Sequence, residues 1–272
     1  MDPRTDQKHL KDSSYSDPNK LNLRNEIQEE YGNHPVPWFE WVFNLLDLTE
    51  SSRILELGCG TGTLWQENNA RVPSGWEIAM SDSALSMVQV SRANLLPLRR
   101  GWSFTSLDGQ VLPFRDESFD AVLAVGLLDQ VSDLNQALGE AWRVLRPSGQ
   151  LIATAGGKGH LQEFENMLRP FIPVDIAHKI GGNEEHFGLE NGERLLSPFF
   201  EEVVRHDYRD RMTFTHLQPI LDYVLSEQEI VWSIPLDKLG LFVNRIKSDL
   251  QRRGEIEVTV RKGMFIARKK VA

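Results

Sequence analysis

A glycine-rich turn with an acidic residue at its base is the part of this sequence best suited to bind a nucleotide-like ligand. Gly58, Gly60 and Gly62 alternate with other residues directly after a short apolar run that contains Glu56. Glycine has no Cβ, so the backbone can turn sharply here and approach a ligand closely. The spacing is not the dinucleotide fingerprint G-x-G-x-x-G, because Thr63 stands where that motif has its third glycine.

Two further acids follow Glu56 at equal intervals of 26 residues. They are Asp82 and Asp108. Each follows a predicted strand, and ligands of open parallel sheets bind beyond the carboxyl ends of the strands. We expect Asp82 to accept hydrogen bonds from ribose hydroxyls and Asp108 to accept one from the exocyclic amine of adenine. Glu56 would orient the turn and favour an amino group, and the backbone donors of the turn suit a carboxylate. Taken alone, Asp82 could equally cap a helix and Asp108 could be a turn residue.

Strands and helices alternate around these residues. Apolar runs predict strands at 53–57, 76–81, 102–107, 119–125 and 150–155. Helical periodicity predicts helices at 63–69, 84–93 and 133–145. Residues 199–206 and 255–267 are candidates for a sixth and a seventh strand. Repeated strand–helix units have right-handed crossovers, so the pattern predicts a doubly wound α/β sheet.

The length of 272 residues allows one large α/β core with additional segments. We expect a mobile tail over residues 1–20, followed by a single domain over 21–272. Within that domain we predict an N-terminal lid helix at about 37–48 and helical cap or insertion segments at about 157–198 and 215–253.

Composition narrows the class of protein. The formal charge of −9 disfavours association with nucleic acid or anionic lipid, although a local basic patch would leave nucleic acid open. No apolar run approaches the roughly 18 residues of a membrane span, and residues 1–20 are too polar for a secretory signal. Cys59 is the only cysteine, which excludes an intrachain disulfide and fits a reducing compartment. We therefore expect a cytoplasmic protein.

Three segments resemble motifs of class I S-adenosylmethionine-dependent methyltransferases. Residues 56–62 are similar to the first motif of that family, E/D-x-G-x-G-x-G. Residues 108–122 resemble its D-x-x-x-L-P-F-x-x-x-x-F-D-x-V segment, and residues 142–151 resemble its R-V-L-R-P-G-G-x-L lead into strand five. The similarity covers about residues 53–155, in the manner of the ubiquinone-biosynthesis-like (methyltransferase type 11) small-molecule enzymes.

This resemblance implies a Rossmann-like sheet of seven strands, mostly parallel with an antiparallel last strand, and S-adenosyl-L-methionine as cofactor. Relatives fold an N-terminal segment over the donor, where aromatic rings can face the sulfonium, although Trp38 could instead pack in a helix core. The implied cofactor-binding residues are Glu56, Gly58, Cys59, Gly60, Gly62, Asp82, Ser83, Asp108, Gly109, Gln110, Gly126, Tyr31 and Trp38.

The acceptor side is less clear from the sequence. Relatives often carry histidine in the loop after strand four, whereas this chain has Asp129 and Gln130. Asp129 and His160 are the candidate catalytic residues, with Asp129 alternatively a capping or surface residue. The Asp-Asn pair that metal-dependent catechol-type relatives carry after strand five is missing from residues 154–158, so we expect no metal.

These observations predict a methyltransferase that acts on O, N or C of a small organic molecule, as a monomer or homodimer, without nucleic-acid or membrane partners. Two alternatives stay open: a donor-binding protein without transfer activity, and a protein or RNA methyltransferase. A nicotinamide-dependent dehydrogenase is disfavoured by the glycine spacing.

Overall fold

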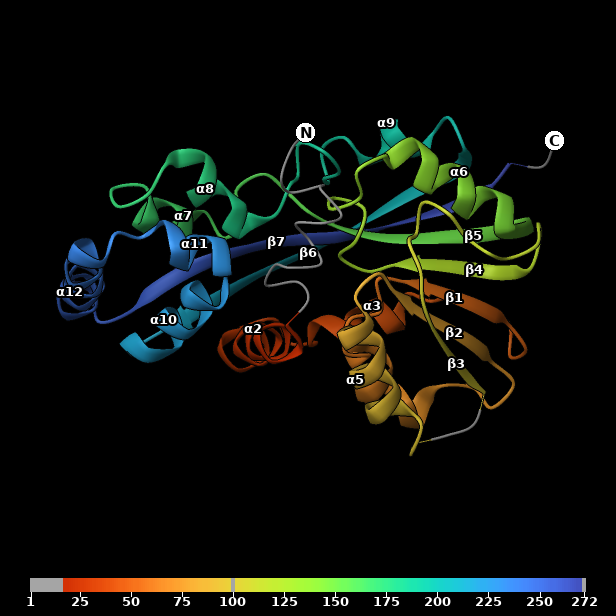
Figure 1. Cartoon of the computed structure of the whole chain (residues 1–272), viewed down its shortest axis with the longest axis horizontal. Helices are drawn as coiled ribbons and strands as arrows, with labels where there is room; N and C mark the ends of the chain where they lie inside the picture. The colour runs from red at the N-terminus through yellow and green to blue at the C-terminus, as the bar shows by residue number, and fades with distance from the viewer. Residues whose placement is uncertain (1–16, 99–100, 271–272) are drawn as a thin grey trace.

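The computed structural model describes residues 17–98 and 101–270. The strands are β1 (Arg53–Leu57), β2 (Glu77–Asp82), β3 (Trp102–Ser106), β4 (Phe119–Ala124), β5 (Leu145–Gly156), β6 (Phe200–Phe214) and β7 (Ile256–Lys269). They form one sheet in the order β3-β2-β1-β4-β5-β7-β6 (Figure 1). β1 to β5 pair in parallel, whereas β7 runs antiparallel to both of its neighbours. The predicted seven-stranded, mostly parallel sheet with an antiparallel last strand is confirmed.

Helices cover both faces of this sheet (Figure 1). The helices of one face are α3 (Trp38–Asn44), α4 (Thr63–Asn68) and α5 (Leu85–Leu95), and those of the other are α6 (Leu134–Val144) and α9 (Gly192–Leu196). A short 3-10 turn, η2 (Asn69–Arg71), follows α4. The central strand β4 is apolar and buried from Ala121 to Ala124, as expected for a parallel strand that is covered on both sides.

β6 and β7 continue beyond the sheet as a two-stranded ribbon (Figure 1). β5 pairs with β7 only as far as Gly156 opposite Lys262, whereas β6 and β7 remain paired to Phe214 opposite Ile256. This ribbon carries a second hydrophobic core, which we call the cap core. Its helices are α2 (Pro18–Tyr31), α7 (Gln162–Leu168), α8 (Val174–His178), the 3-10 turn η3 (Lys179–Gly181), α10 (Leu217–Ser226), α11 (Gln228–Ser233) and α12 (Leu236–Arg253).

The structure differs from the sequence prediction at β5, at β6 and near the N-terminus. β5 begins at Leu145, five residues before the predicted start at 150. β6 extends eight residues beyond the predicted end at His206, because its outer half pairs with β7 and buries Tyr208, Met212 and Phe214 in the cap core. Residues 1–16 of the expected mobile tail lie outside the described residues, and α2 begins at Pro18, inside that expected tail. Across the part of the chain that the structure describes, no helix has the length and apolar character required to span a membrane.

Candidate ligand-binding site

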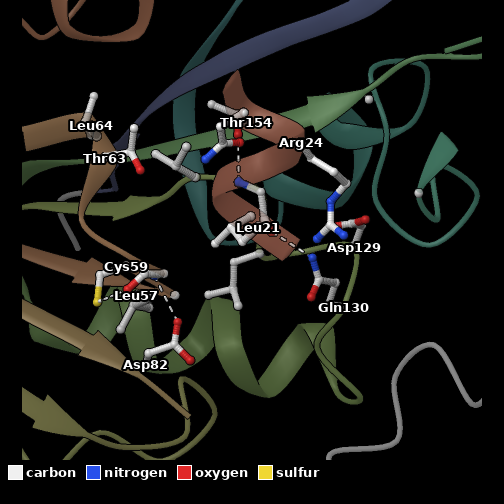
Figure 2. A pocket seen from close by; sticks show the side chains of 18 of the residues that line it. Leu21, Arg24, Leu57, Cys59, Thr63, Leu64, Asp82, Asp129, Gln130 and Thr154 are labelled. Atoms are coloured by element: carbon white, nitrogen blue, oxygen red, sulfur yellow. Dashed lines mark hydrogen bonds between the residues drawn. The ribbon is translucent and has the colours of Figure 1, made fainter. Parts of the chain in front are cut away.

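A cavity of about 320 Å³ lies at the carboxyl ends of β1, β2, β4 and β5 (Figure 2). The strand order reverses between β1 and β4, which is where open α/β sheets bind their ligands. The sheet loops form one side of the cavity, and α2, α10 and β7 contribute the other. Its volume falls in the range of small-molecule sites.

The glycine turn after β1 adopts a conformation that depends on glycine. Gly58, Gly60 and Gly62 have φ of +69°, +51° and +82°, in the left-handed region that other residues rarely adopt. A Cβ added at Gly60 would lie 2.9 Å from Cδ2 of Leu21, so α2 packs directly over the turn. Thr61 Oγ1 also donates to Asn22 Oδ1 of α2 at 2.7 Å. The positive φ values of the glycines therefore set the shape of the turn, and α2 covers it.

Asp82 joins β2 to this turn. Its Oδ2 accepts from the Gly60 N–H at 3.0 Å, and its Oδ1 accepts from the Ala84 N–H at 2.9 Å. Burial raises the pKa of Asp82, and the backbone donors partly oppose that shift. Each carboxylate oxygen has a second lone-pair direction, so Asp82 can still accept from a ligand hydroxyl.

Glu56 lies beneath the turn, where water is excluded. Its Oε2 accepts from Trp65 Nε1 at 2.6 Å, and burial raises the pKa of Glu56 to about 8. The side chain is therefore protonated near neutral pH in the folded chain. A ligand ammonium beside it would favour the carboxylate and lower this pKa.

Asp108 and Gln110 form a local pair at the end of β3. Asp108 Oδ1 accepts from the backbone N–H of Gln110 at 2.9 Å and from its Nε2 at 3.0 Å. Gln110 Oε1 in turn accepts from the Asp133 N–H at 2.7 Å, the start of α6. Asp108 lines the cavity, whereas Gln110 is buried behind it and does not.

The structure brings most of the predicted cofactor-binding residues together at the cavity. Those that line it are Glu56, Gly58, Cys59, Gly60, Asp82, Ser83, Asp108, Gly109, Gly126 and Trp38. Gly62, Gln110 and Tyr31 do not line it. Tyr31 instead stacks on Phe214 of the ribbon, with ring centroids 4.9 Å apart. Figure 2 shows Cys59 and Asp82 on one side of the cavity and Arg24, Asp129 and Gln130 on the other.

Asp129 and His160, the two candidate catalytic residues, both line the cavity. Asp129 Oδ2 accepts from the Asn183 N–H at 3.3 Å, and burial raises the pKa of Asp129. His160 Nδ1 accepts from the Arg261 N–H at 3.3 Å. Burial, reinforced by the charge of Lys262, lowers the pKa of His160 to about 3. A neutral ring with Nδ1 as acceptor carries its proton on Nε2, so His160 is a hydrogen-bond donor in this arrangement.

Sequence reasoning missed the residues that α2, α10 and β7 contribute. Arg24 of α2 forms a buried ion pair with Glu227 at 3.1 Å, and Gln28 Nε2 donates to Tyr223 Oη at 2.7 Å. Lys262 reaches the cavity from β7. α2 is polar and has no clear apolar stripe, and Lys262 is one polar position in an alternating strand. Neither pattern distinguishes these residues from solvated ones.

Nothing in the described residues suggests a metal centre, since no group of three or more histidine, cysteine, aspartate or glutamate side chains is arranged to hold an ion.

Residues 55–153 match a family model described as a methyltransferase domain. The chain is 28% identical over 164 residues to the ubiquinone/menaquinone biosynthesis C-methyltransferase UbiE of Pectobacterium carotovorum, which covers 60% of this chain and 64% of the relative. It is 33% identical over 135 residues to UbiE of Hahella chejuensis, covering 49% and 53%. The match therefore spans less than two thirds of these relatives. The predicted resemblance to class I methyltransferases is confirmed.

Solved structures share the fold at low sequence identity. Haemonchus contortus phosphoethanolamine N-methyltransferase 2, in complex with S-adenosyl-L-methionine, is 15% identical with a TM-score of 0.57, covering 94% of this chain and 58% of that one. The [4+2]-cyclase SpnF is 19% identical with a TM-score of 0.55, covering 86% and 81%. Because a methyltransferase and a cyclase have this fold, the fold alone does not define the reaction.

Proposed function

We propose, from the class I methyltransferase character of residues 55–153 and the geometry of the cavity, that this protein is an S-adenosyl-L-methionine-dependent methyltransferase. It transfers a methyl group to O, N or C of a small organic molecule. The observation that carries the proposal is the glycine turn of positive φ, anchored through the Gly60 N–H to Asp82 at the point where the strand order reverses. A Cβ at Gly60 would lie 2.9 Å from Leu21 Cδ2, and the acids around the turn suit the ammonium and hydroxyl groups of an amino acid joined to a nucleoside.

Within this proposal the backbone of the turn and the acids around it have separate roles. The N–H groups of Cys59, Gly60 and Gly62 donate to Ser81, Asp82 and Cys59 of the chain itself, so the turn offers the methionine moiety a close backbone surface rather than these donors. Glu56 favours the ammonium of that moiety. Asp82 accepts from the ribose hydroxyls, and Asp108 accepts from the adenine amine. Trp38 lies at the cavity and contributes an aromatic wall.

The methyl donor supplies an electrophilic carbon on a sulfonium, so the chain mainly has to align the acceptor and exclude water. Good alignment is worth about 7–11 kcal/mol of the barrier. The cover formed by α2 supports this role, because Leu21 packs on the glycine turn and Asn22 bonds to Thr61. His160 has a proton on Nε2 and its other ring nitrogen engaged, so we favour Asp129 over His160 where the reaction needs a base.

We further infer that residues 21–272 act as one catalytic domain, with α2 and α3 as the N-terminal cover and the cap core over the acceptor. The cavity between the sheet loops and the cap favours a small acceptor over a polymer. The single cysteine fits a reducing compartment, which supports a cytoplasmic location.

Calorimetric titration of the full chain with S-adenosylmethionine, S-adenosylhomocysteine and NAD tests the cofactor assignment. We expect micromolar binding of both sulfur ligands and none of NAD. Binding of NAD would overturn the assignment. Unchanged affinity of the Asp82→Ala variant for both sulfur ligands would overturn it as well. Methyl transfer itself is tested by incubating the protein with methyl-labelled donor and a panel of small acids, amines and phenols, followed by mass analysis of the products.

A further inference from the structure

Lys262 is a lysine of the cavity that the function proposed above does not use. It lies on β7 opposite Gly156 at the end of β5, and opposite Tyr208 on β6. The candidate catalytic residue His160 lines the same cavity. A group bound at Lys262 would therefore share the cavity with a candidate catalytic residue, where we place the acceptor.

Two aromatic rings lie beside the ammonium of Lys262. Its Nζ lies 4.0 Å from the ring centroid of Trp38 and 5.8 Å from that of Tyr208. Its hydrogen bond is to Gln28 Oε1 at 2.8 Å. No carboxylate within residues 17–98 or 101–270 forms an ion pair with this ammonium, and burial lowers the pKa of Lys262 to about 7. An ammonium has three N–H donors, so this one has donors to spare for an anion.

His160 provides a second donor close to Lys262. Gly156 pairs with Lys262 across β5 and β7, and a Cβ added at Gly156 would lie 3.6 Å from His160 Cδ2, so the two side chains are neighbours. Both line the same cavity, and the neutral His160 ring has its proton on Nε2. One ammonium and one neutral N–H make a pair of donors that matches the two oxygens of a carboxylate.

The negative charge of Asp210 acts on Lys262 and partly opposes the lowering of its pKa by burial. The other titratable side chains that share a cavity with Lys262 are Tyr208, His34, Glu29, Glu67, Arg24, Tyr223, Glu227, Asp129, His160, Glu56, Cys59, Asp82 and Asp108. Asp210 accepts from the Asn33 N–H at 2.9 Å, and Glu227 pairs with Arg24. Asp129 is bonded to residue 183. A carboxylate on a ligand would give Lys262 the ion pair that no carboxylate of residues 17–98 or 101–270 forms with it.

We propose that Lys262, together with His160, binds a carboxylate of the methyl acceptor, so that the acceptor is a small carboxylic acid. This inference rests on the proposed methyltransferase function and narrows its substrate class. The positive sulfonium of the donor would favour an anionic acceptor in the same cavity. Lys262 acts as a positioning residue, because it orients the acceptor and does not touch the transferred methyl group.

A structural role for Lys262 makes a different prediction. A buried ammonium without a charged partner costs free energy of folding. We therefore expect Lys262→Met to be at least as stable to urea as the wild type, which is the behaviour of a residue kept for binding. A large loss of stability would instead point to a packing role.

The binding test uses matched fragments on the full chain. Benzoate and phenylacetate are titrated by calorimetry and ligand-observed NMR, each beside its primary amide and its amine, with and without S-adenosylhomocysteine. We expect at least one carboxylate to bind the wild type about tenfold or more tightly than its amide. Lys262→Met should abolish this preference, while Lys247→Met, an exposed lysine on α12, should keep it. No carboxylate preference in the wild type, or one that survives in Lys262→Met, would overturn the proposal.

Proton uptake by the protein on binding shows whether Lys262 recognises the charge of the carboxylate or only the shape of the ligand. An anion beside Lys262 raises its pKa from about 7, so carboxylate binding at pH 8 should take up a proton. The uptake appears as a difference in binding enthalpy between phosphate and Tris buffers, and it should vanish in Lys262→Met. Uptake that persists in that variant contradicts the assignment. A wild type that binds no S-adenosylhomocysteine overturns the methyltransferase proposal separately, because the fragment titrations without it still decide the role of Lys262.

Discussion

The half of the molecule built on β1–β5 and the half built on the β6–β7 ribbon line one cavity by different means. The first half presents backbone: a turn of positive-φ glycines with acids at the strand ends. The second presents side chains from distant segments, as where Gln28 and Trp38 meet Lys262. A site made of backbone tolerates few substitutions and comes from one short stretch of sequence. A site made of side chains from distant segments forms only when the chain folds. The first should therefore control donor binding and the second acceptor choice.

The largest expected effect is a loss of stability caused by a substitution in the cap core, which should leave donor binding unchanged. Phe242 of α12 is fully buried in the cap core, with its ring centroid 5.5 Å from that of Phe171. Phe242→Ala should lower the free energy of unfolding by about 3–5 kcal/mol, because it leaves a cavity. The exposed neighbour Leu241 provides the control, since Leu241→Ala should change it by less than about 0.5 kcal/mol.

Urea denaturation followed by circular dichroism measures this change. Below the transition, Phe242→Ala should keep the affinity of the wild type for S-adenosylhomocysteine. A fall in that affinity while the protein is folded would mean that the cap also shapes the donor side, and the division between the two halves would fail.

The next effect tests the backbone cradle directly. Gly60→Val should weaken binding of S-adenosylhomocysteine by at least about 100-fold, because the left-handed φ of +51° is strained for valine and its Cβ would meet Leu21. Gly240→Val in α12 is the matched control, because an added Cβ there meets nothing within 4 Å. Calorimetry compares the two variants. Equal affinities would show that the turn does not hold the donor.

A smaller loss is expected when the acid of β2 is removed. Asp82→Ala deletes the acceptor of the Gly60 and Ala84 N–H groups and of the ribose hydroxyls. Affinity for S-adenosylhomocysteine should fall about 10–100-fold, the range of a hydrogen bond to a charged group. Asp82→Asn keeps one acceptor oxygen and should lose less, and the exposed Asp237→Ala should lose nothing. A reversed order of the Asn and Ala variants would argue against the ribose role.

The same division explains what the sequence could predict. β1, with the buried run from Ile54 to Leu57 and the glycines after it, was predicted with its exact bounds because the pattern is local. β6 was predicted too short, because charged residues such as Arg209 and Arg211 alternate with the buried Tyr208 and interrupt the apolar signal. Its length depends on pairing with β7, about fifty residues further along the chain.

α2 and Lys262 were missed for a related reason. The segment from Pro18 to Tyr31 is polar, and its two buried residues, Arg24 and Ile27, do not form a periodic apolar face. The partners of the buried Arg24 include Ser226 and Glu227, which lie far away along the chain. Lys262 likewise acquires its environment from Gln28 and Trp38. Such contacts have no signature in a single sequence.

The smallest expected effect concerns Tyr31, one of the two aromatic residues that the resemblance assigned to the donor site. The ring of Tyr31 stacks on Phe214, outside the lining of the cavity. Tyr31→Phe keeps this stacking, so it should change the affinity for S-adenosylmethionine and S-adenosylhomocysteine by less than about 0.5 kcal/mol. The comparison of the two ligands is informative, because only the first carries a sulfonium that an aromatic face would favour. Should Tyr31→Leu weaken S-adenosylmethionine alone, the ring would have to leave Phe214 when the donor binds. The end of α2 that carries Tyr31 would then move between two positions. Whether Tyr31 belongs to the donor side or to the cap would depend on the bound ligand.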